Sequence, residues 1–159
     1  MSVDMFMKMA PVKGESRDKK HKEEIDVLAW SWGCSNSGSA HVGGGAGSGK
    51  VSVSDLTVTK YVDSASTDLL LACCNGTHFD EALLTVRKAG GKEPIEYIKI
   101  TMNEVLITSV QTGGAESDDR LRENCSLNFA KVKVEYTGQD EKGAAGATQT
   151  MEWDIAGNA

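Results

Sequence analysis

Apolar and polar residues alternate along most of the chain, a pattern that predicts many short β-strands. The alternation is clear in five segments: Met5–Met9, Val51–Val53, Leu56–Val62, Leu83–Lys88 and Met151–Ile155. Residues 95–110 predict one long strand or a bent pair of strands. Many short strands with little helix indicate a mainly β fold, a closed or nearly closed β-barrel.

The segment Glu24–Gly33 predicts a strong strand that is apolar on both faces. One face carries Ile25, Val27 and Ala29, and the other carries Leu28, Trp30 and Trp32. Core packing is the first interpretation of the two tryptophans, and a subunit contact is compatible with it. A strand covered on both sides needs a second layer, either a helix or another subunit, so this segment favours assembly.

One segment predicts a helix, at about residues 64–75, flanking the barrel. Asp63 and Ser64 can cap its first turn, and Asn75-Gly76 supplies a left-handed stop. Between them Ala65, Leu69, Ala72 and Cys73 follow helical spacing.

Two further segments are irregular. In Ser126–Tyr136 the apolar face changes phase after Phe129, which predicts a bulge or a strand that changes neighbours. Residues 34–50 are rich in Ser, Gly and Ala and predict a long extended loop, and Thr112–Glu123 predicts a polar loop. Gly138–Thr148 predicts a low-complexity hairpin or loop, and the role of the segment 138–150 is left open.

Length and charge narrow the class of protein. At 159 residues the chain is expected to form one domain, residues 1–159. With 17 basic and 23 acidic residues the net charge is −6, so a nucleic-acid partner is not expected. The longest apolar stretch, Leu69–Cys74, is far shorter than the roughly 20 residues of a membrane span, so membrane insertion is not expected. The N-terminus lacks a basic segment followed by an apolar one, so we expect no signal peptide and synthesis in the cytoplasm.

No cofactor or metal site is expected. The cysteines, Cys34, Cys73, Cys74 and Cys125, form no C-x-x-C pair, and the three histidines do not complete a zinc spacing. Free thiols in a reducing compartment are the favoured interpretation.

The glycine-rich segment Gly44–Lys50 matches part of a phosphate-binding P-loop. A complete motif needs Ser or Thr next and then a helix, whereas Val51 follows here and the chain alternates like a strand. No G-x-S-x-G elbow marks a nucleophile, and the pairs Glu23-Glu24 and Asp118-Asp119 are interpreted as solvated charges. The chain is therefore not expected to be an enzyme.

Several longer motifs resemble the Hcp (haemolysin-coregulated protein) family of type VI secretion. They are Gly14–Ser16, Glu24–Gly33, Asp55–Asp63, Leu84–Gly91, Glu96-Tyr97 and Asn124–Val134, in the order and at the length typical of that family. The likeness runs from Asp4 to about Tyr136.

The resemblance implies a barrel of two sheets with one flanking helix, six copies of which close into a ring. Rings of this family stack into a tube inside a contractile sheath and beneath a spike protein, and the tube is expelled from the cell. The resemblance further implies that small effector proteins are carried in the ring lumen.

The resemblance also implies roles for particular residues. Ser31 matches a strand position expected to face the lumen and contact effectors, and Leu28, Trp30 and Trp32 are candidates for the ring interface. A loop expected to reach a neighbouring subunit or ring comprises His41, Val42, Gly43, Gly44, Gly45, Ala46, Gly47, Ser48, Gly49 and Lys50.

Two other functions stay open at this point. One is a monomeric β-barrel that binds a small ligand or peptide, which predicts a single species near the monomer mass. The other, disfavoured by Val51, is a nucleotide-binding enzyme that uses the Gly44–Lys50 loop.

Overall fold

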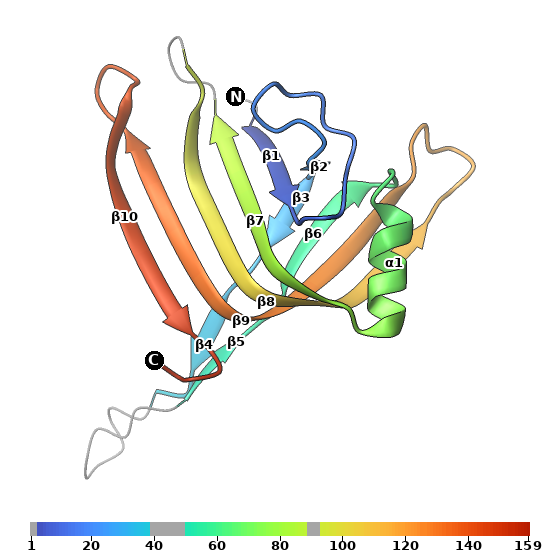
Figure 1. The fold of residues 1–159 in the computed structure, drawn as a ribbon. Coiled ribbons are helices and arrows are strands. Elements are labelled where there is room, and N and C mark those ends of the chain that lie inside the picture. The colour runs from blue at the N-terminus through green and yellow to red at the C-terminus, as the bar shows by residue number, and fades with distance from the viewer. Residues whose placement is uncertain (1–2, 39–49, 89–92) are drawn as a thin grey trace.

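The computed structural model describes residues 3–38, 50–88 and 93–159 (Figure 1). These residues form ten strands and one helix, in a mainly β fold as the alternation predicts. The elements are β1 (Val3–Lys8), β2 (Ile25–Asp26), β3 (Ala29–Ser31), β4 (Cys34–Asn36), β5 (Val51–Val53), β6 (Leu56–Tyr61), α1 (Ser66–Asn75), β7 (His78–Lys88), β8 (Ile95–Gly113), β9 (Arg122–Gln139) and β10 (Ala145–Asp154). The assignment of residues 1–159 to one domain stays a prediction.

Eight strands form one antiparallel sheet that curls into an open half-barrel (Figure 1). Its order is β2-β1-β7-β8-β9-β6-β3, with β10 added to the side of β9. The two end strands, β2 and β3, are successive pieces of one segment: the Val27 amide donates to Met5 on β1, and the Leu28 amide donates to Thr59 on β6. That segment therefore joins both ends of the sheet. The second sheet is only the hairpin β4–β5, which projects from the body (Figure 1).

The segment Glu24–Gly33 is not the continuous strand that its alternation predicts. It breaks into β2 and β3 because the chain changes partner between Val27 and Leu28. The break also changes which side chains face inward: Ile25 and Val27 are buried before it, whereas Ala29 is exposed after it and Trp30 packs against the core. Much of the double-sided apolar pattern is thus explained within one chain, without a second layer.

The long strands β7, β8 and β9 bend together, and this accounts for the phase change after Phe129. At one row across the three strands the regular pairing is interrupted: the residues there are Asp80, Glu104 and Ala130. Glu104 has a φ of 56°. On either side of that row the buried positions switch parity: Phe79 and Ala82 on β7, Met102 and Val105 on β8, and Phe129 and Val132 on β9. Both halves of each strand consequently direct apolar side chains into the core.

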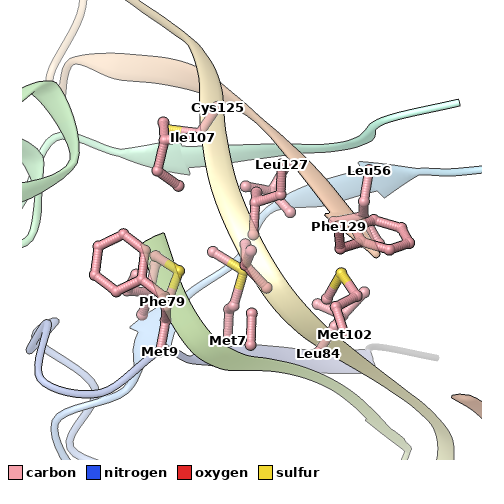
Figure 2. Packing of buried hydrophobic residues seen from close by; sticks show 14 of the residues in the cluster. Met7, Met9, Leu56, Phe79, Leu84, Met102, Ile107, Cys125, Leu127 and Phe129 are labelled. Atoms are coloured by element: carbon pink, nitrogen blue, oxygen red, sulfur yellow. The ribbon is translucent and has the colours of Figure 1, made fainter. Parts of the chain in front are cut away.

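The core fills the inside of the curled sheet with methionine, leucine, valine and phenylalanine side chains (Figure 2). Helix α1 covers part of it through Leu69 and Ala72, both buried. The predicted stop is confirmed, because Gly76 is left-handed with a φ of 69° and its amide donates to the Ala72 carbonyl. The helix begins at Ser66, two residues later than predicted, after a turn in which the Asp63 carboxylate accepts the Ala65 amide.

Several strand boundaries lie outside the predicted limits, among them those of β9, which spans Arg122–Gln139 rather than Ser126–Tyr136 and so takes in the end of the predicted loop Thr112–Glu123. Within the predicted loop 34–50, Cys34–Asn36 pairs with β5 as strand β4. Strand β7 begins at His78 rather than Leu83, β8 continues to Gly113, and β10 begins at Ala145. In each case polar residues extend a strand by pairing their backbones with a neighbour, which the side-chain pattern does not record.

In the part of the chain that the structure describes, α1 is the longest helix, and no helix is long and apolar enough to cross a membrane.

Candidate functional site

A row of hydroxyl groups crosses four strands on the outer face of the sheet. Ser31 on β3 lies opposite Thr57 on β6, Thr57 lies opposite Ser126 on β9, and Ser126 lies opposite Ser109 on β8. The Thr57 and Ser126 hydroxyl oxygens are 3.2 Å apart, within hydrogen-bond distance. Ser31, expected from the resemblance to contact effectors, is exposed at one end of this row.

A second row runs beside the first. It consists of Ala29, Thr59, Asn124 and Gln111 on the same four strands, and Thr59 donates to the Asn124 side-chain oxygen at 2.7 Å. We call the two rows the hydroxyl–amide face: Ala29, Ser31, Thr57, Thr59, Ser109, Gln111, Asn124 and Ser126. None of the eight side chains is charged, although a quarter of the residues in the chain are. A broad polar surface without ions can hydrogen-bond to many partners without selecting them by charge.

The inner face of the same strands carries the core and, beyond it, α1. Side chains alternate across a strand, so Leu56 and Val58 on β6 and Cys125 and Leu127 on β9 point inward and are buried. The residues of α1 that are buried belong to the same core cluster. The hydroxyl–amide face and α1 therefore lie on opposite sides of this part of the sheet.

A buried ionic network supports the hydroxyl–amide face from within. Lys60, on the inner side of β6, is fully buried and contacts the Glu123 carboxylate, also fully buried, directly across on β9. Lys60 also lies 2.8 Å from the Asp63 carboxylate, and the Ser66 hydroxyl donates to Glu123 at 2.6 Å. The network thus ties β6 and β9 to the first residue of α1.

The sequence interpretation missed this network. Lys60 stands between Val58 and Val62 in the alternating segment Leu56–Val62, on the same strand face as these two valines, and that position was the available signal. Beside the network, burial and the nearby Glu123 charge raise the pKa of the Cys125 thiol to about 12.

A second surface is apolar and lies between the projecting hairpin and the edge of the main sheet. It is a pocket of about 220 Å³ lined by Trp32, Val51, Val53, Val132, Met151 and Trp153, together with Cys34. We call it the apolar groove. Met151 is 43% exposed, and the indole N–H groups of Trp32 and Trp153 are buried without a hydrogen-bond partner within the described residues. Nearby on β9, Tyr136 is 49% exposed.

Two of the predicted site residues belong to these surfaces: Ser31 to the hydroxyl–amide face and Trp32 to the apolar groove. Leu28 and Trp30 belong to neither; both are half-buried, and Trp30 packs against the core. Of the predicted contact loop, Lys50 is exposed next to β5, and residues 41–49 lie outside the described residues. Whether any of these residues contacts another molecule stays a prediction.

The described residues provide no metal centre, because none of their His, Cys, Asp and Glu side chains form a group of three that could hold an ion. The segment after the glycine-rich loop is strand β5, as the alternation predicts, and not the helix that a phosphate-binding loop requires.

Known proteins resemble the chain over its whole length. The family model described as "Type VI secretion system effector, Hcp" matches residues 6–136. Protein hcp1 of Pseudomonas aeruginosa is 59% identical over 159 residues, which cover 99% of this chain and 98% of that protein.

Solved structures agree with the sequence comparison. A structure of a type six secretion system protein superimposes with a TM-score of 0.92 at 32% identity and covers 99% of both chains. The crystal structure of Hcp1 from Salmonella typhimurium superimposes with a TM-score of 0.83 at 37% identity, covering 99% of this chain and 98% of that one.

Proposed function

The chain belongs to the Hcp family of type VI secretion proteins, and from that premise we propose that it is a structural subunit of the secretion tube. In this proposal six copies close into a ring and rings stack into a tube that is itself exported. The tube carries effector proteins in its lumen. The chain performs no catalysis.

The hydroxyl–amide face is the observation that carries the proposal. A wall that holds different effector proteins and later releases them needs many weak polar contacts, without apolar patches that would bind firmly. The eight residues of this face meet that requirement, and Ser31 is one of them. We therefore assign the hydroxyl–amide face to the lumen and α1, on the opposite side of the sheet, to the outer wall.

The apolar groove supports the assignment of a ring contact. A closed ring of identical copies uses two different surfaces of each chain, which meet head to tail. A half-exposed apolar surface such as Met151 and Tyr136 gains stability when a neighbour covers it. Trp32 of the predicted interface strand lines this groove, so we place one side of the ring contact there. Leu28 and Trp30 remain further candidates for the ring contact.

The remaining partners follow from the same proposal. The loop His41–Lys50 reaches a neighbouring subunit or ring, the spike protein sits at the tip of the tube, and the contractile sheath surrounds its outer wall. The subunit is made in the cytoplasm and leaves the cell through the secretion machine.

Mass measurement tests the ring. Size exclusion with light scattering should give a species of about six times 17.0 kDa, and negative-stain images of that peak should show rings with an open centre. A stable monomer at high concentration would contradict the ring and favour the ligand-binding barrel, for which the apolar groove would be the binding site.

Gold labelling tests which face lines the lumen. Cys34 and Cys74 are exposed, so the variant C34S/C74S/S31C presents its one exposed thiol on the hydroxyl–amide face. Maleimide nanogold on this variant should appear at the ring centre. The matched control, C34S alone, keeps native Cys74 on α1 and should carry gold on the outer rim. Gold on the rim in both variants would refute the assignment while leaving the ring intact.

A further inference from the structure

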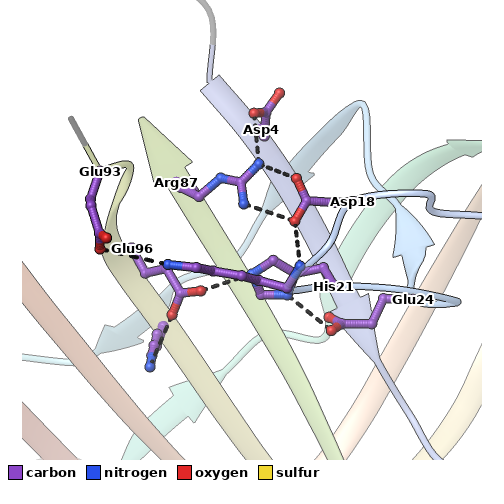
Figure 3. Close-up of polar contacts among 9 residues, drawn as sticks. Asp4, Asp18, His21, Glu24, Arg87, Glu93 and Glu96 are labelled. Atoms are coloured by element: carbon purple, nitrogen blue, oxygen red, sulfur yellow. Dashed lines mark hydrogen bonds and ion pairs between the residues drawn. The ribbon is translucent and has the colours of Figure 1, made fainter. Parts of the chain in front are cut away.

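The loop between β1 and β2 is held against the sheet by a cluster centred on His21 (Figure 3). This side chain is buried, at 7% exposure, although the sequence places it among lysines and glutamates. Its Nδ1 lies 2.9 Å from a Glu24 carboxylate oxygen, and its Nε2 lies 2.8 Å from a Glu96 carboxylate oxygen on β8. The ring therefore bridges the end of the loop and a strand 75 residues away in sequence.

These two contacts define the protonation state of the ring. An ionised carboxylate only accepts hydrogen bonds, and a neutral imidazole has one N–H donor and one bare nitrogen. Both contacts are hydrogen bonds only if both ring nitrogens carry hydrogen, so His21 is an imidazolium in this arrangement. Loss of one proton would leave a nitrogen lone pair facing a carboxylate oxygen at under 3 Å, which is repulsive.

The surroundings favour the positive charge. The ring stacks on Phe6 with centroids 4.4 Å apart and planes inclined by 9°, which places a cation over an aromatic face. Burial opposes ionisation of Glu96, but hydrogen bonds from Lys99 and His21 hold its pKa below the ordinary value, so this carboxylate stays ionised in the neutral range.

Other charged groups complete the environment of His21. From the loop, Asp18 lies close enough to interact electrostatically with it, and Lys20 reaches Glu93 at 3.9 Å. From β7, Arg87 lies 5.1 Å from the Phe6 ring centre and donates hydrogen bonds to Asp18 at 3.0 Å and to Asp4 of β1 at 3.1 Å. From β8, Lys99 pairs with Glu96 at 3.1 Å. Acidic groups contact the imidazolium directly, whereas the lysines and Arg87 pair with those acids or with their neighbours.

The cluster fastens a loop that has its own internal order. The Gly14 amide donates to the Glu23 carbonyl at 2.8 Å, the Glu23 amide donates to Ser16 at 2.9 Å, and the Ser16 amide donates to Glu24 at 3.0 Å. Its second half is held to strands β7 and β8 by His21 on Glu96 and Asp18 on Arg87, whereas its first half is bonded to Ser64, whose amide donates to the Glu15 carboxylate at 3.1 Å and whose hydroxyl donates to the Lys13 carbonyl at 3.0 Å. Among these contacts, only that of His21 with Glu96 involves an imidazole, the side chain that most commonly changes charge near neutral pH in proteins.

We propose that His21, Glu24, Glu96 and Phe6 form a proton-dependent clip that holds the loop Val12–Glu24 against β1, β7 and β8. The clip is closed while His21 is an imidazolium and opens as the pH rises through the deprotonation of that ring. Opening frees the loop locally and leaves the barrel folded, because the core residues lie on the other side of β1 and β7. The loop is thereby a segment whose attachment responds to the pH of the compartment in which the protein stands.

Nuclear magnetic resonance of the histidine rings tests the charge state. At pH 7 both His21 ring nitrogens should have protonated chemical shifts, and the exposed His78 ring provides the reference in the same spectra. A single neutral tautomer of His21 at pH 7 would overturn the proposal.

Amide exchange measured against pH tests the opening. After correction for intrinsic exchange, protection of the Ser16 and Glu23 amides should fall by about tenfold or more as His21 deprotonates, while amides of β8 and β9 stay protected. In H21Q these loop amides should be unprotected to a similar degree at every pH. The matched control H78Q should keep the wild-type profile.

A second variant, E96Q, distinguishes the effect of charge from a purely structural effect of H21Q. E96Q keeps the shape of the site and removes one of the two negative charges, so it should shift the opening to lower pH without abolishing it. Loop protection with the same pH profile in wild type, H21Q and E96Q would overturn the proposal.

Discussion

Lys60 and Glu123 stand directly opposite each other on β6 and β9, and both side chains are fully excluded from solvent. They are the only charged pair among the described residues in which both members have no exposure. One carboxylate oxygen of Glu123 has no hydrogen-bond partner within the described residues, so Lys60 and Ser66 provide its compensation. The pair belongs to the layer directly beneath the hydroxyl–amide face.

Removing the lysine from this pair should destabilise the folded protein. K60M leaves the Glu123 and Asp63 carboxylates facing an apolar side chain, and we expect a loss of about 3–5 kcal/mol in the free energy of unfolding. Urea denaturation measures it. The double variant K60M/E123L should recover much of the lost stability, because it also removes the Glu123 charge that K60M leaves without a partner. The control K131M, at an exposed position on β9, should stay within about 0.5 kcal/mol of wild type. A single-variant loss below about 1 kcal/mol would contradict the role of the pair.

The ion pair between Asp18 and Arg87 should contribute stability that acid removes. Hydrogen bonds from Arg87 hold the pKa of Asp18 well below its usual range, so the folded state favours the ionised form. The contribution is therefore complete above the ordinary aspartate pKa and is lost as the pH falls toward the lower folded-state value. D18N should be less stable than wild type at pH 7 by a few tenths to about 1 kcal/mol, and the difference should shrink below about pH 4.

Thermal unfolding of D18N and wild type between pH 7 and pH 2 checks this dependence. D119N, which removes an exposed carboxylate from the turn before β9, should not show it. A stability difference between wild type and D18N that grew as the pH fell would contradict the prediction.

The four thiols should differ sharply in reactivity. Burial raises the pKa of Cys125 to about 12, and the side chain has no exposed surface, so this thiol should be inert in the folded protein. Cys34 and Cys74 are exposed and should react first with a maleimide. Mass mapping after brief labelling distinguishes them, and early modification of Cys125 would contradict the buried position.

The apolar groove should be essential for assembly and dispensable for folding. M151K places a charge on a side chain that is 43% exposed, so the monomer should keep its circular dichroism and its thermal midpoint within a few degrees. The same charge should prevent the ring if a neighbouring copy covers the groove, and light scattering would then report the monomer. T150K, one residue away on the opposite face of β10, is the matched control and should assemble normally. If M151K formed rings as readily as wild type, the subunit contact would not be at the apolar groove.

The pattern of apolar and polar residues predicted an element well where its structure depends only on neighbouring residues. Strand β6 and helix α1 follow the predicted limits within two residues, because alternation and a left-handed glycine act over a few neighbouring positions. The segment Glu24–Gly33 was wrong as one strand because its two halves pair with strands from opposite ends of the sheet. A change of partner depends on distant parts of the chain, and a window of ten residues does not contain it.

The sites depended even more on long-range register. Ser31, Thr57, Ser109 and Ser126 come from four strands spread over most of the chain, and they form a row only after the strands are aligned. The phase change after Phe129 was visible in sequence, whereas its counterparts on β7 and β8 and the shared row at Glu104 were not recognised. Lys60 was overlooked because a lysine between two valines is ordinarily an exposed residue.

The neutrality of the hydroxyl–amide face has a consequence for delivery. Serine, threonine, asparagine and glutamine side chains neither gain nor lose a proton across the biological range, and salt screens them little. If this face lines the lumen, as we propose, an effector bound to it would be held with similar strength in the donor cell, outside it and in an acidic vesicle. Neither acidity nor ionic strength would then be the signal for release. Release would instead follow from separation of the copies, when the many weak contacts are no longer held together in one enclosure.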